Sequence, residues 1–324
     1  MWPGKATLWE MTCLLGADWY VIPQAQETDY HRNLLTKHPR LREIVSKWVK
    51  NVVSPEEIPF DEYDVVITFD PILSTSDSSH TLLAYYLNEH WDRLYKQSLQ
   101  RPIGNYDLFL AHMMDAETDV ISLPQAISFP YLRAPDVVRS VFNSEKEETV
   151  WVDWRTLTTL SLTERWSCEA EKAANRLQET LAIPVCYYGD FNQSPYGVFD
   201  PPKWGDAVHY LERLGRCKYY IAVGRASGAG QGLCDAASLS CICIGEQDKA
   251  FHSLVCHPAC LCADMVEMPR RIRQVVSSLA LQEEVLHWQD NMLREHFANR
   301  PLAVLEKAIA MRRGRLMSEQ AVAW

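Results

Sequence analysis

The sequence of 324 residues lacks several features that would place it in a special class of protein. It has no run of about 18 consecutive apolar residues, so no segment is predicted to span a membrane. The first thirty residues include Glu10, Asp18 and Glu27 and no long apolar run, so no secretory signal is predicted. Internal repeats and low-complexity stretches are also absent. These absences favour a globular, cytoplasmic protein.

An excess of basic residues is lacking too. The chain has 32 Lys and Arg against 42 Asp and Glu, which gives a formal net charge of −10 and a pI of about 5.5. Nucleic-acid-binding domains usually have a pI above ~9, so nucleic acid is not an expected partner. A local basic pocket for a small anion is compatible with this charge balance.

Ten cysteines are too few for a disulfide scaffold, and without an export signal they are expected to be reduced thiols. Cys256, Cys260 and Cys262, with His252 and His257, are the residue types of a structural zinc site. Their spacing lacks a paired C-x2-C module, so buried thiols are the preferred interpretation and zinc is the alternative. No D-x-D motif occurs in the predicted site described below, so no obligatory metal is expected. No cofactor is expected either.

The sequence does contain an alternation of short β-rich runs and longer helical patterns, which is typical of stacked βα units and a mainly parallel sheet. In the N-terminal half, helices are predicted at Ala6–Leu15 and from about His80 to Leu99. Residues 124–135 hold three prolines and are predicted to be irregular. Strands are predicted in the same half at Trp19–Ile22, Tyr63–Phe69 and Asp107–Ala111.

The C-terminal half is more regular. Five βα steps follow one another from a strand at Thr149–Asp153 to a helix at Pro269–Leu281, which is the size of one doubly wound domain. Two further helices are predicted after this domain, separated near Pro301. The predicted organisation is an N-terminal α/β domain over 1–148, a nucleotide-binding α/β domain over 149–282, and helices that pack back on the domains over 283–324.

One predicted strand of the C-terminal half is followed by three glycines, Gly224, Gly228 and Gly230, and by a helix that begins at Gln231. Glycine lets the backbone approach a ligand closely, and a helix N-terminus offers free N–H groups that favour a phosphate. Asp235 lies one helical turn further on, where a carboxylate can accept hydrogen bonds from ribose hydroxyls. The alternative is a tight strand-to-helix turn whose small residues serve packing.

The run from Asp235 to Ile244 resembles the nucleotide-sugar motif of GT-B glycosyltransferases with a family 4-like C-terminal domain, in which an acid and small residues precede a buried strand. Ser240 and Ile242 stand where the family usually has Gly and Pro, and Ser227 stands at the first acid of its E-x7-E pattern. The resemblance implies that Asp235 holds the ribose and that the donor's sugar and phosphates meet Gly228, Ala229, Gly230 and Gln231.

Two arginines are candidates for binding the phosphates. Arg155 follows the strand that ends at Asp153, at the place where many family members carry a phosphate-binding Arg or Lys. Arg225 lies in the glycine loop itself. A guanidinium is always charged and can grip phosphate through two parallel hydrogen bonds. For Arg155 a surface ion pair is the alternative.

Two candidate bases follow strands of the N-terminal half. His112 comes directly after the strand that ends at Ala111, which resembles the family's strand that ends in a histidine near the acceptor. Asp70 follows the strand that ends at Phe69, and the carboxyl ends of strands are where α/β sites lie. A hydrogen-bonded rim residue is the alternative for His112, and a turn-forming Asp before Pro71 is the alternative for Asp70.

The resemblance as a whole implies two Rossmann-like domains that face each other across a cleft, with an abbreviated N-terminal domain. It implies a metal-independent glycosyltransferase that moves a sugar from a nucleoside-diphosphate sugar to a glycan, a lipid or a small molecule. A sugar-nucleotide epimerase with the same frame and a non-catalytic GT-B-like protein that binds nucleotide sugars are the two alternatives.

Overall fold

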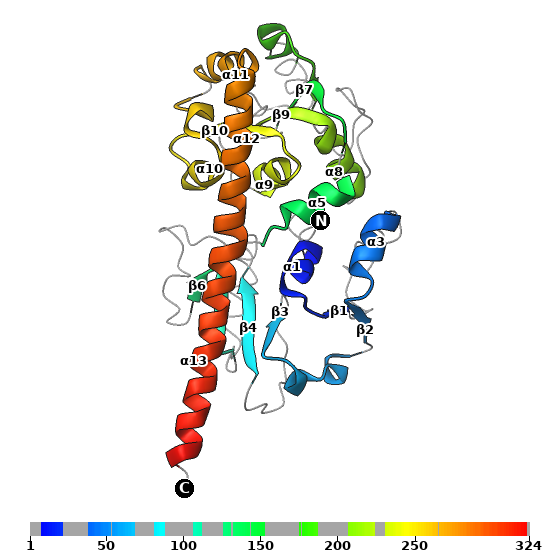
Figure 1. The fold of residues 1–324 in the computed structure, drawn as a ribbon, viewed down its shortest axis with the longest axis vertical. Helices are drawn as coiled ribbons and strands as arrows, with labels where there is room; N and C mark the ends of the chain where they lie inside the picture. The colour runs from blue at the N-terminus through cyan, green and yellow to red at the C-terminus, as the bar shows by residue number, and fades with distance from the viewer. Residues whose placement is uncertain are drawn as a thin grey trace, which may run out of the picture. The chain divides into compact units, whose positions relative to one another are not determined.

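The computed structural model describes residues 8–21, 38–52, 54–68, 81–87, 106–111, 126–130, 132–142, 144–152, 175, 177–186, 207–223, 231–264 and 266–322. These residues form two compact units (Figure 1). Unit 1 comprises the described residues within Met1–Ala17, Gln26–Trp48 and Arg133–His296. Unit 2 comprises those within Asp18–Ala25, Val49–Leu132 and Phe297–Trp324.

Unit 1 is built on a sheet of five parallel strands in the order β11-β10-β9-β7-β8. The strands are β7 (Glu147–Val152), β8 (Val185–Cys186), β9 (Cys217–Ile221), β10 (Ile242–Glu246) and β11 (Leu261–Cys262). Numbered along the chain this order is 2-1-3-4-5, the order of one common class of doubly wound sheet. The strand order of such a sheet reverses between its first and third strands, which here are β7 and β9.

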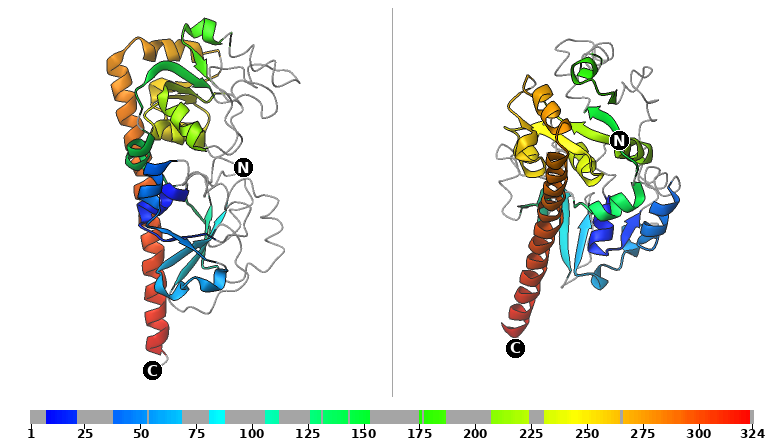
Figure 2. Two further views of the ribbon diagram at one scale, coloured as in Figure 1. Left: turned by 90° about the vertical axis from the view of Figure 1, so that its right-hand side faces the viewer. Right: turned by 45° about the horizontal axis from the view of Figure 1, so that its top comes forward.

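Helices pack on this sheet and bury its apolar residues. The packing on β7 and β9 comes from α8 (Ala207–Arg216), and that on β10 comes from α9 (Gln231–Ser238), α10 (Ala250–Val255), α11 (Met268–Val276) and α12 (Leu279–Arg294). Figure 2 shows α12 in orange along one side of the unit 1 sheet. Consecutive residues of β7, β9 and β10 are buried, as expected for parallel strands that are covered on both faces.

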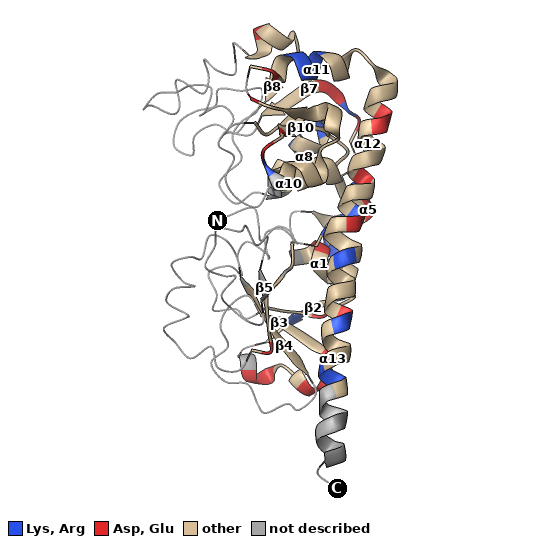
Figure 3. Cartoon of the chain, turned by 90° about the vertical axis from the view of Figure 1, so that its left-hand side faces the viewer, with Lys and Arg blue, Asp and Glu red and all other residues tan. Residues whose placement is uncertain are grey.

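Three helices from earlier in the sequence complete unit 1. They are α1 (Leu8–Leu15), α3 (Pro39–Val45) and α5 (Pro135–Phe142). α1 packs on α3 and α5, and α5 packs on α8, α9 and α12. Charged residues of α5 and α12 lie side by side, and Figure 3 shows both helices. A 3-10 turn, η6 (Pro258–Cys260), precedes β11.

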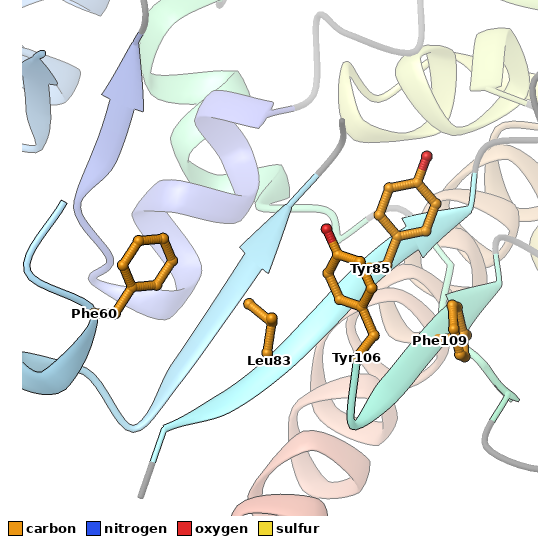
Figure 4. Close-up of a cluster of buried hydrophobic side chains, with 5 residues drawn as sticks. All are labelled: Phe60, Leu83, Tyr85, Tyr106 and Phe109. Atoms are coloured by element: carbon orange, nitrogen blue, oxygen red, sulfur yellow. The ribbon is translucent and has the colours of Figure 1, made fainter. Parts of the chain in front are cut away.

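Unit 2 holds a sheet of four parallel strands in the order β3-β4-β5-β6, with β3 (Val65–Thr68), β4 (Leu82–Leu87), β5 (Leu108–Ala111) and β6 (Ala126–Ser128). A separate parallel pair joins β1 (Trp19–Val21) to β2 (Val49–Asn51), and 3-10 turns form η2 (Pro55–Glu57) and η3 (Phe60–Glu62). Figure 4 shows the core at this sheet, which contains Phe60, Leu83, Tyr85, Tyr106 and Phe109. The predicted α/β class with parallel sheets is confirmed.

The last helices form a continuous helical stretch in the sequence. α12 ends at Arg294, a π-helical segment η7 (Glu295–Asn299) follows, and α13 covers Arg300–Val322. Pro301 therefore lies inside this stretch, near where the sequence predicted a break. Proline lacks an N–H and its ring crowds the carbonyl four residues earlier, so a regular α-helical ladder is disfavoured there. The π-helical segment ends two residues before Pro301. α13 packs on β4 within unit 2.

Two predictions for the N-terminal half were wrong. The segment predicted as a helix from His80 to Leu99 contains the strand β4, because a continuous apolar run suits a fully buried central strand as well as a helix. The segment 124–135, predicted to be irregular, contains β6 and the first residue of α5.

The two units do not follow the predicted boundary at residue 148. The chain passes from unit 2 into unit 1 at Arg133, and from unit 1 into unit 2 at Phe297. The physical reason is that α1 packs on α3 and α5, and α5 packs on the helices α8, α9 and α12 of the C-terminal sheet. The division into domains at 1–148, 149–282 and 283–324 stays a prediction made from the sequence.

Candidate functional site

The reversal of strand order between β7 and β9 is where a doubly wound sheet usually binds its ligand, outside the carboxyl ends of the strands. Val152, the last residue of β7, is paired with Ile221, the last residue of β9. The segments that leave these strands therefore start one strand spacing, about 5 Å, apart. One segment leads to Arg155, and the other leads through the glycine loop to α9. The two predicted phosphate-binding segments thus follow, in the sequence, two strands whose carboxyl ends lie at one edge of one sheet.

Most predicted donor-side residues lie outside the described residues, namely Arg155, Arg225, Gly228, Ala229 and Gly230. Gln231 is the first residue of α9. The described side chains at this site are those of residues further along α9 and of its neighbours.

Gly232, in the first turn of α9, is required by close packing. A Cβ atom at this position would lie 2.5 Å from the Tyr220 hydroxyl on β9 and 3.6 Å from the Tyr210 hydroxyl on α8. Tyr220 is buried, and the Tyr210 ring contacts the ring of Trp151 on β7. Tyr220 and Tyr210 therefore form an aromatic wall against the start of α9, and Trp151 packs on Tyr210. The sequence analysis did not use Gly232, although its alternation with Gly228 and Gly230 was visible.

Asp235, the predicted ribose ligand, is buried in the structure. Its Oδ1 atom lies 2.5 Å from Nη1 of Arg133, the residue where the chain enters unit 1. Tyr210 also forms a hydrogen bond with the carboxylate. A carboxylate has about four lone-pair sites, so these contacts do not exhaust its capacity as an acceptor. The ribose contact stays a prediction.

The same guanidinium nitrogen binds a second carboxylate, which the sequence analysis missed. Oε1 of Glu10, on α1, lies 3.0 Å from Arg133 Nη1, and Oε2 accepts a hydrogen bond of 2.8 Å from the Ala134 N–H. The exposed fractions are 2% for Glu10, 1% for Arg133 and 3% for Asp235. We call these three residues the Arg133 cluster. Nothing in the local sequence signals it, because more than a hundred positions separate Arg133 from each carboxylate.

The Arg133 cluster holds two acids for one base, so it carries a net negative charge when all three groups are ionised. Burial raises the pKa of Glu10 to about 7, against the opposing attraction of Arg133 and the hydrogen bond from Ala134. Burial also raises the pKa of Asp235, and Arg133 and Tyr210 oppose that shift. Asp235 has the shorter contact with the guanidinium, so Glu10 is the group that we expect to take up a proton near neutral pH.

Ser240, which stands where the resembled motif usually has Gly, has a backbone conformation that glycine favours. Its backbone φ is +59°, in the left-handed region that favours glycine, and it lies between α9 and β10. The family's usual glycine at this place would adopt that conformation without strain.

The two predicted bases both follow strands of the unit 2 sheet. β3 ends at Thr68 and β5 ends at Ala111, and these parallel strands flank β4, so their carboxyl ends lie on one edge about 10 Å apart. In the sequence, Asp70 comes two residues after the end of β3 and His112 comes one residue after the end of β5. Both lie outside the described residues. Their roles stay predictions.

The cysteines of the alternative zinc site are buried thiols in the structure. His252 Nδ1 accepts a hydrogen bond of 2.9 Å from the Glu246 N–H, and His257 Nδ1 accepts one of 3.1 Å from the Ala259 N–H. Within the described ranges, no group of three or more His, Cys, Asp or Glu residues is arranged to hold a metal ion. Among the helices in these ranges, none has the length and apolar character needed to cross a membrane.

Comparisons with known proteins complete the description. No family model matches the sequence, and no curated protein matches it. Among solved structures, the chain is similar to the pneumococcal O-GlcNAc transferase GtfA in complex with UDP and GlcNAc, with 11% identity, a TM-score of 0.43, and coverage of 72% of this chain and 53% of that one. It thus spans about half the length of that transferase.

The chain is also similar to two further solved structures, and it covers a larger part of each of them. One is T4 phage BGT in complex with UDP and Mn2+, with 11% identity, a TM-score of 0.42, and coverage of 90% of this chain and 97% of that one. The other is the trehalose-6-phosphate synthase OtsA, with 9% identity, a TM-score of 0.48, and coverage of 71% of this chain and 67% of that one.

Proposed function

We propose that this protein is a glycosyltransferase that uses a nucleoside-diphosphate sugar and binds the nucleotide on unit 1. The observation that carries the proposal is the order of the unit 1 sheet. That order makes β7 and β9 neighbours, and their carboxyl ends lie at the edge where doubly wound sheets bind ligands. In this proposal, Arg155 and the glycine loop, which follow these strands in the sequence, bind the nucleotide there. The motif from Asp235 to Ile244 supports a nucleotide sugar as the ligand.

The proposed chemistry assigns one task to each group. Loop N–H groups and the N-terminus of α9 bind the diphosphate, and Arg155 and Arg225 neutralise its charge. These donors stabilise the negative charge that develops on the departing nucleoside diphosphate, which lowers the barrier to transfer. Asp235 accepts hydrogen bonds from the ribose. His112 or Asp70 takes the proton of the acceptor hydroxyl as the new bond forms.

Nucleotide binding is the first test. Calorimetry on the full chain with UDP, GDP and their sugars is expected to show binding by at least one nucleotide. Arg155→Ala is expected to weaken that binding by about tenfold or more, because a hydrogen bond to a charged group contributes ~1.5–3 kcal/mol. Arg216→Ala is the matched control, since Arg216 is exposed at the end of α8. No binding by any of these nucleotides at millimolar concentration contradicts the proposal.

Product analysis is the second test, and it separates the three candidate activities. A labelled sugar nucleotide is expected to transfer its sugar to an acceptor and release the nucleoside diphosphate. An epimerase instead changes the sugar without transferring it, and a binding protein leaves the sugar nucleotide intact. Transfer is expected to persist in EDTA, because the proposed mechanism relies on N–H groups and guanidinium groups in place of a metal.

A further inference from the structure

The geometry of the Arg133 cluster carries an inference about the nucleotide site. One atom, Arg133 Nη1, contacts Oε1 of Glu10 at 3.0 Å and Oδ1 of Asp235 at 2.5 Å. A terminal guanidinium nitrogen has two hydrogens, so it can donate one to each carboxylate. Glu10 is held in turn by the Ala134 N–H. These contacts form a chain of bonds from the backbone at Ala134 to the second turn of α9.

Fold stability by itself gives little reason for this arrangement. Removing charges from water is costly, and replacing a buried ion cluster by apolar residues of similar volume is often neutral or stabilising. What the cluster does provide is a defined position for the Asp235 carboxylate. Tyr210, which bonds to Asp235, belongs to the same aromatic wall that packs on Gly232 at the start of α9.

We propose that Arg133 is a positioning residue of the nucleotide site, which orients the Asp235 carboxylate and offsets its charge, and that Glu10 holds Arg133 in place. This inference rests on the proposed function. A diphosphate at the start of α9 lies about one helical turn from Asp235, and an uncompensated carboxylate at that distance repels it. Arg133 therefore acts on the ligand through Asp235, without contact with the ligand.

The other titratable groups that face the cluster do not replace this role. Cys13 on α1, Cys234 on α9 and Tyr210 on α8 are its neighbours. Burial raises the pKa of both thiols, that of Cys234 to about 12, so both are neutral at physiological pH. Arg133 is thus the group in the cluster that supplies positive charge to Asp235.

A double-mutant cycle on nucleotide affinity tests the inference. Calorimetry with UDP, or with whichever of UDP, GDP or ADP binds the wild-type chain, is carried out on Arg133→Met, Asp235→Asn and the double variant. Arg133→Met is expected to weaken binding by about tenfold. In the Asp235→Asn background the same change is expected to alter affinity by less than about twofold, because a residue that acts through another has no effect once that residue is removed. Arg133→Lys is expected to restore part of the affinity.

The matched control is Arg139→Met. Arg139 also binds two carboxylates, those of Asp136 and Asp290, but it does so on the surface of unit 1. This change is expected to leave nucleotide affinity unaltered. If Arg133→Met does not fold, the cycle is run with Arg133→Lys, which keeps the buried positive charge and changes only the geometry.

Each outcome decides the question. Equal losses of affinity from the Arg133 change in both backgrounds overturn the positioning role, since Arg133 then acts independently of Asp235. Unchanged affinity in folded Arg133 variants overturns it as well. A wild-type chain that binds no nucleotide removes the proposed function, and the Arg133 cluster is then a structural element of unit 1.

Discussion

Two clusters of arginine and aspartate or glutamate in unit 1 use the same chemistry in opposite surroundings. The Arg133 cluster joins α1 to α9 and is at most 3% exposed. The second cluster joins α5 to α12 on the surface, where Arg139 and Arg294 each bind Asp136 and Asp290 at distances between 2.7 and 3.1 Å. The side chains of Asp136 and Arg294 are 68% and 41% exposed. We call this second set the surface network.

The two clusters shift the pKa of their acids in opposite directions. In the surface network, the hydrogen bond from Arg294 is the main cause that lowers the pKa of Asp136 to about 2. In the Arg133 cluster, burial outweighs the attraction of the arginine and raises the pKa of Glu10 to about 7. The surface network has two arginines for two carboxylates and is exposed to water, so the carboxylates stay charged. The Arg133 cluster has one arginine for two carboxylates and is buried, so the charged form of Glu10 is disfavoured. Charge balance and solvent together decide the direction of the shift.

The largest expected effect comes from removing the buried arginine. Arg133→Met leaves two buried carboxylates without their cation, and breaking a buried ion pair from one side costs about 3–5 kcal/mol. Urea unfolding of the variant and the wild type measures this loss. Replacing all three members of the cluster by apolar residues is expected to recover most of the stability. If the triple variant is as unstable as Arg133→Met, desolvated charge is not the cause of the loss.

An intermediate effect is expected in the pH dependence of stability. The pKa of Glu10 is raised in the folded state, so its contribution to stability is present below the ordinary pKa of 4.5 and is lost as pH rises through about 7. The pKa of Asp136 is lowered, so its contribution to stability is present above the ordinary pKa of 3.8 and is lost as pH falls through about 2. Glu10→Gln is expected to flatten the decline between pH 4.5 and about 7.

Unfolding free energies across this pH range, measured for the wild type and for Glu10→Gln, test the assignment. Asp136→Asn is the control, because it should change the dependence at low pH and leave the range near neutrality unaltered. An unchanged slope in Glu10→Gln would show that another group titrates there.

The smallest effect is expected in the surface network. Arg139→Met is expected to cost at most about 1 kcal/mol, because exposed ion pairs contribute about 0–1 kcal/mol. Salt at 1 M shortens the screening length to ~3 Å, so this loss should shrink further, whereas the loss in Arg133→Met should persist. Urea unfolding of both variants at low and high salt makes the measurement. An equal salt response in the two variants would remove the distinction between the clusters.

Local pattern predicted much of unit 1. The strands β7, β9 and β10 are short apolar runs, and β9 and β10 are each followed by a helix, so the βα steps could be recognised along the chain. The glycine loop before α9 was recognised for the same reason. In unit 2 the pattern failed at β4, because LLAYYL is a continuous run without polar alternation and has neither the period of a strand nor that of a helix. Only its neighbours β3 and β5 decide that it is a strand.

The sequence by itself determined the α/β class, the position of the glycine loop and the acid one turn into α9, since each depends on residues that are close together in the chain. The tertiary structure alone decided the strand order that makes β7 and β9 neighbours, and the partners of Asp235. Arg133 and Glu10 lie 102 and 225 positions from Asp235 in the chain. They meet it only because α1, the start of α5 and α9 pack together and exclude water, and that packing has no signature in local sequence.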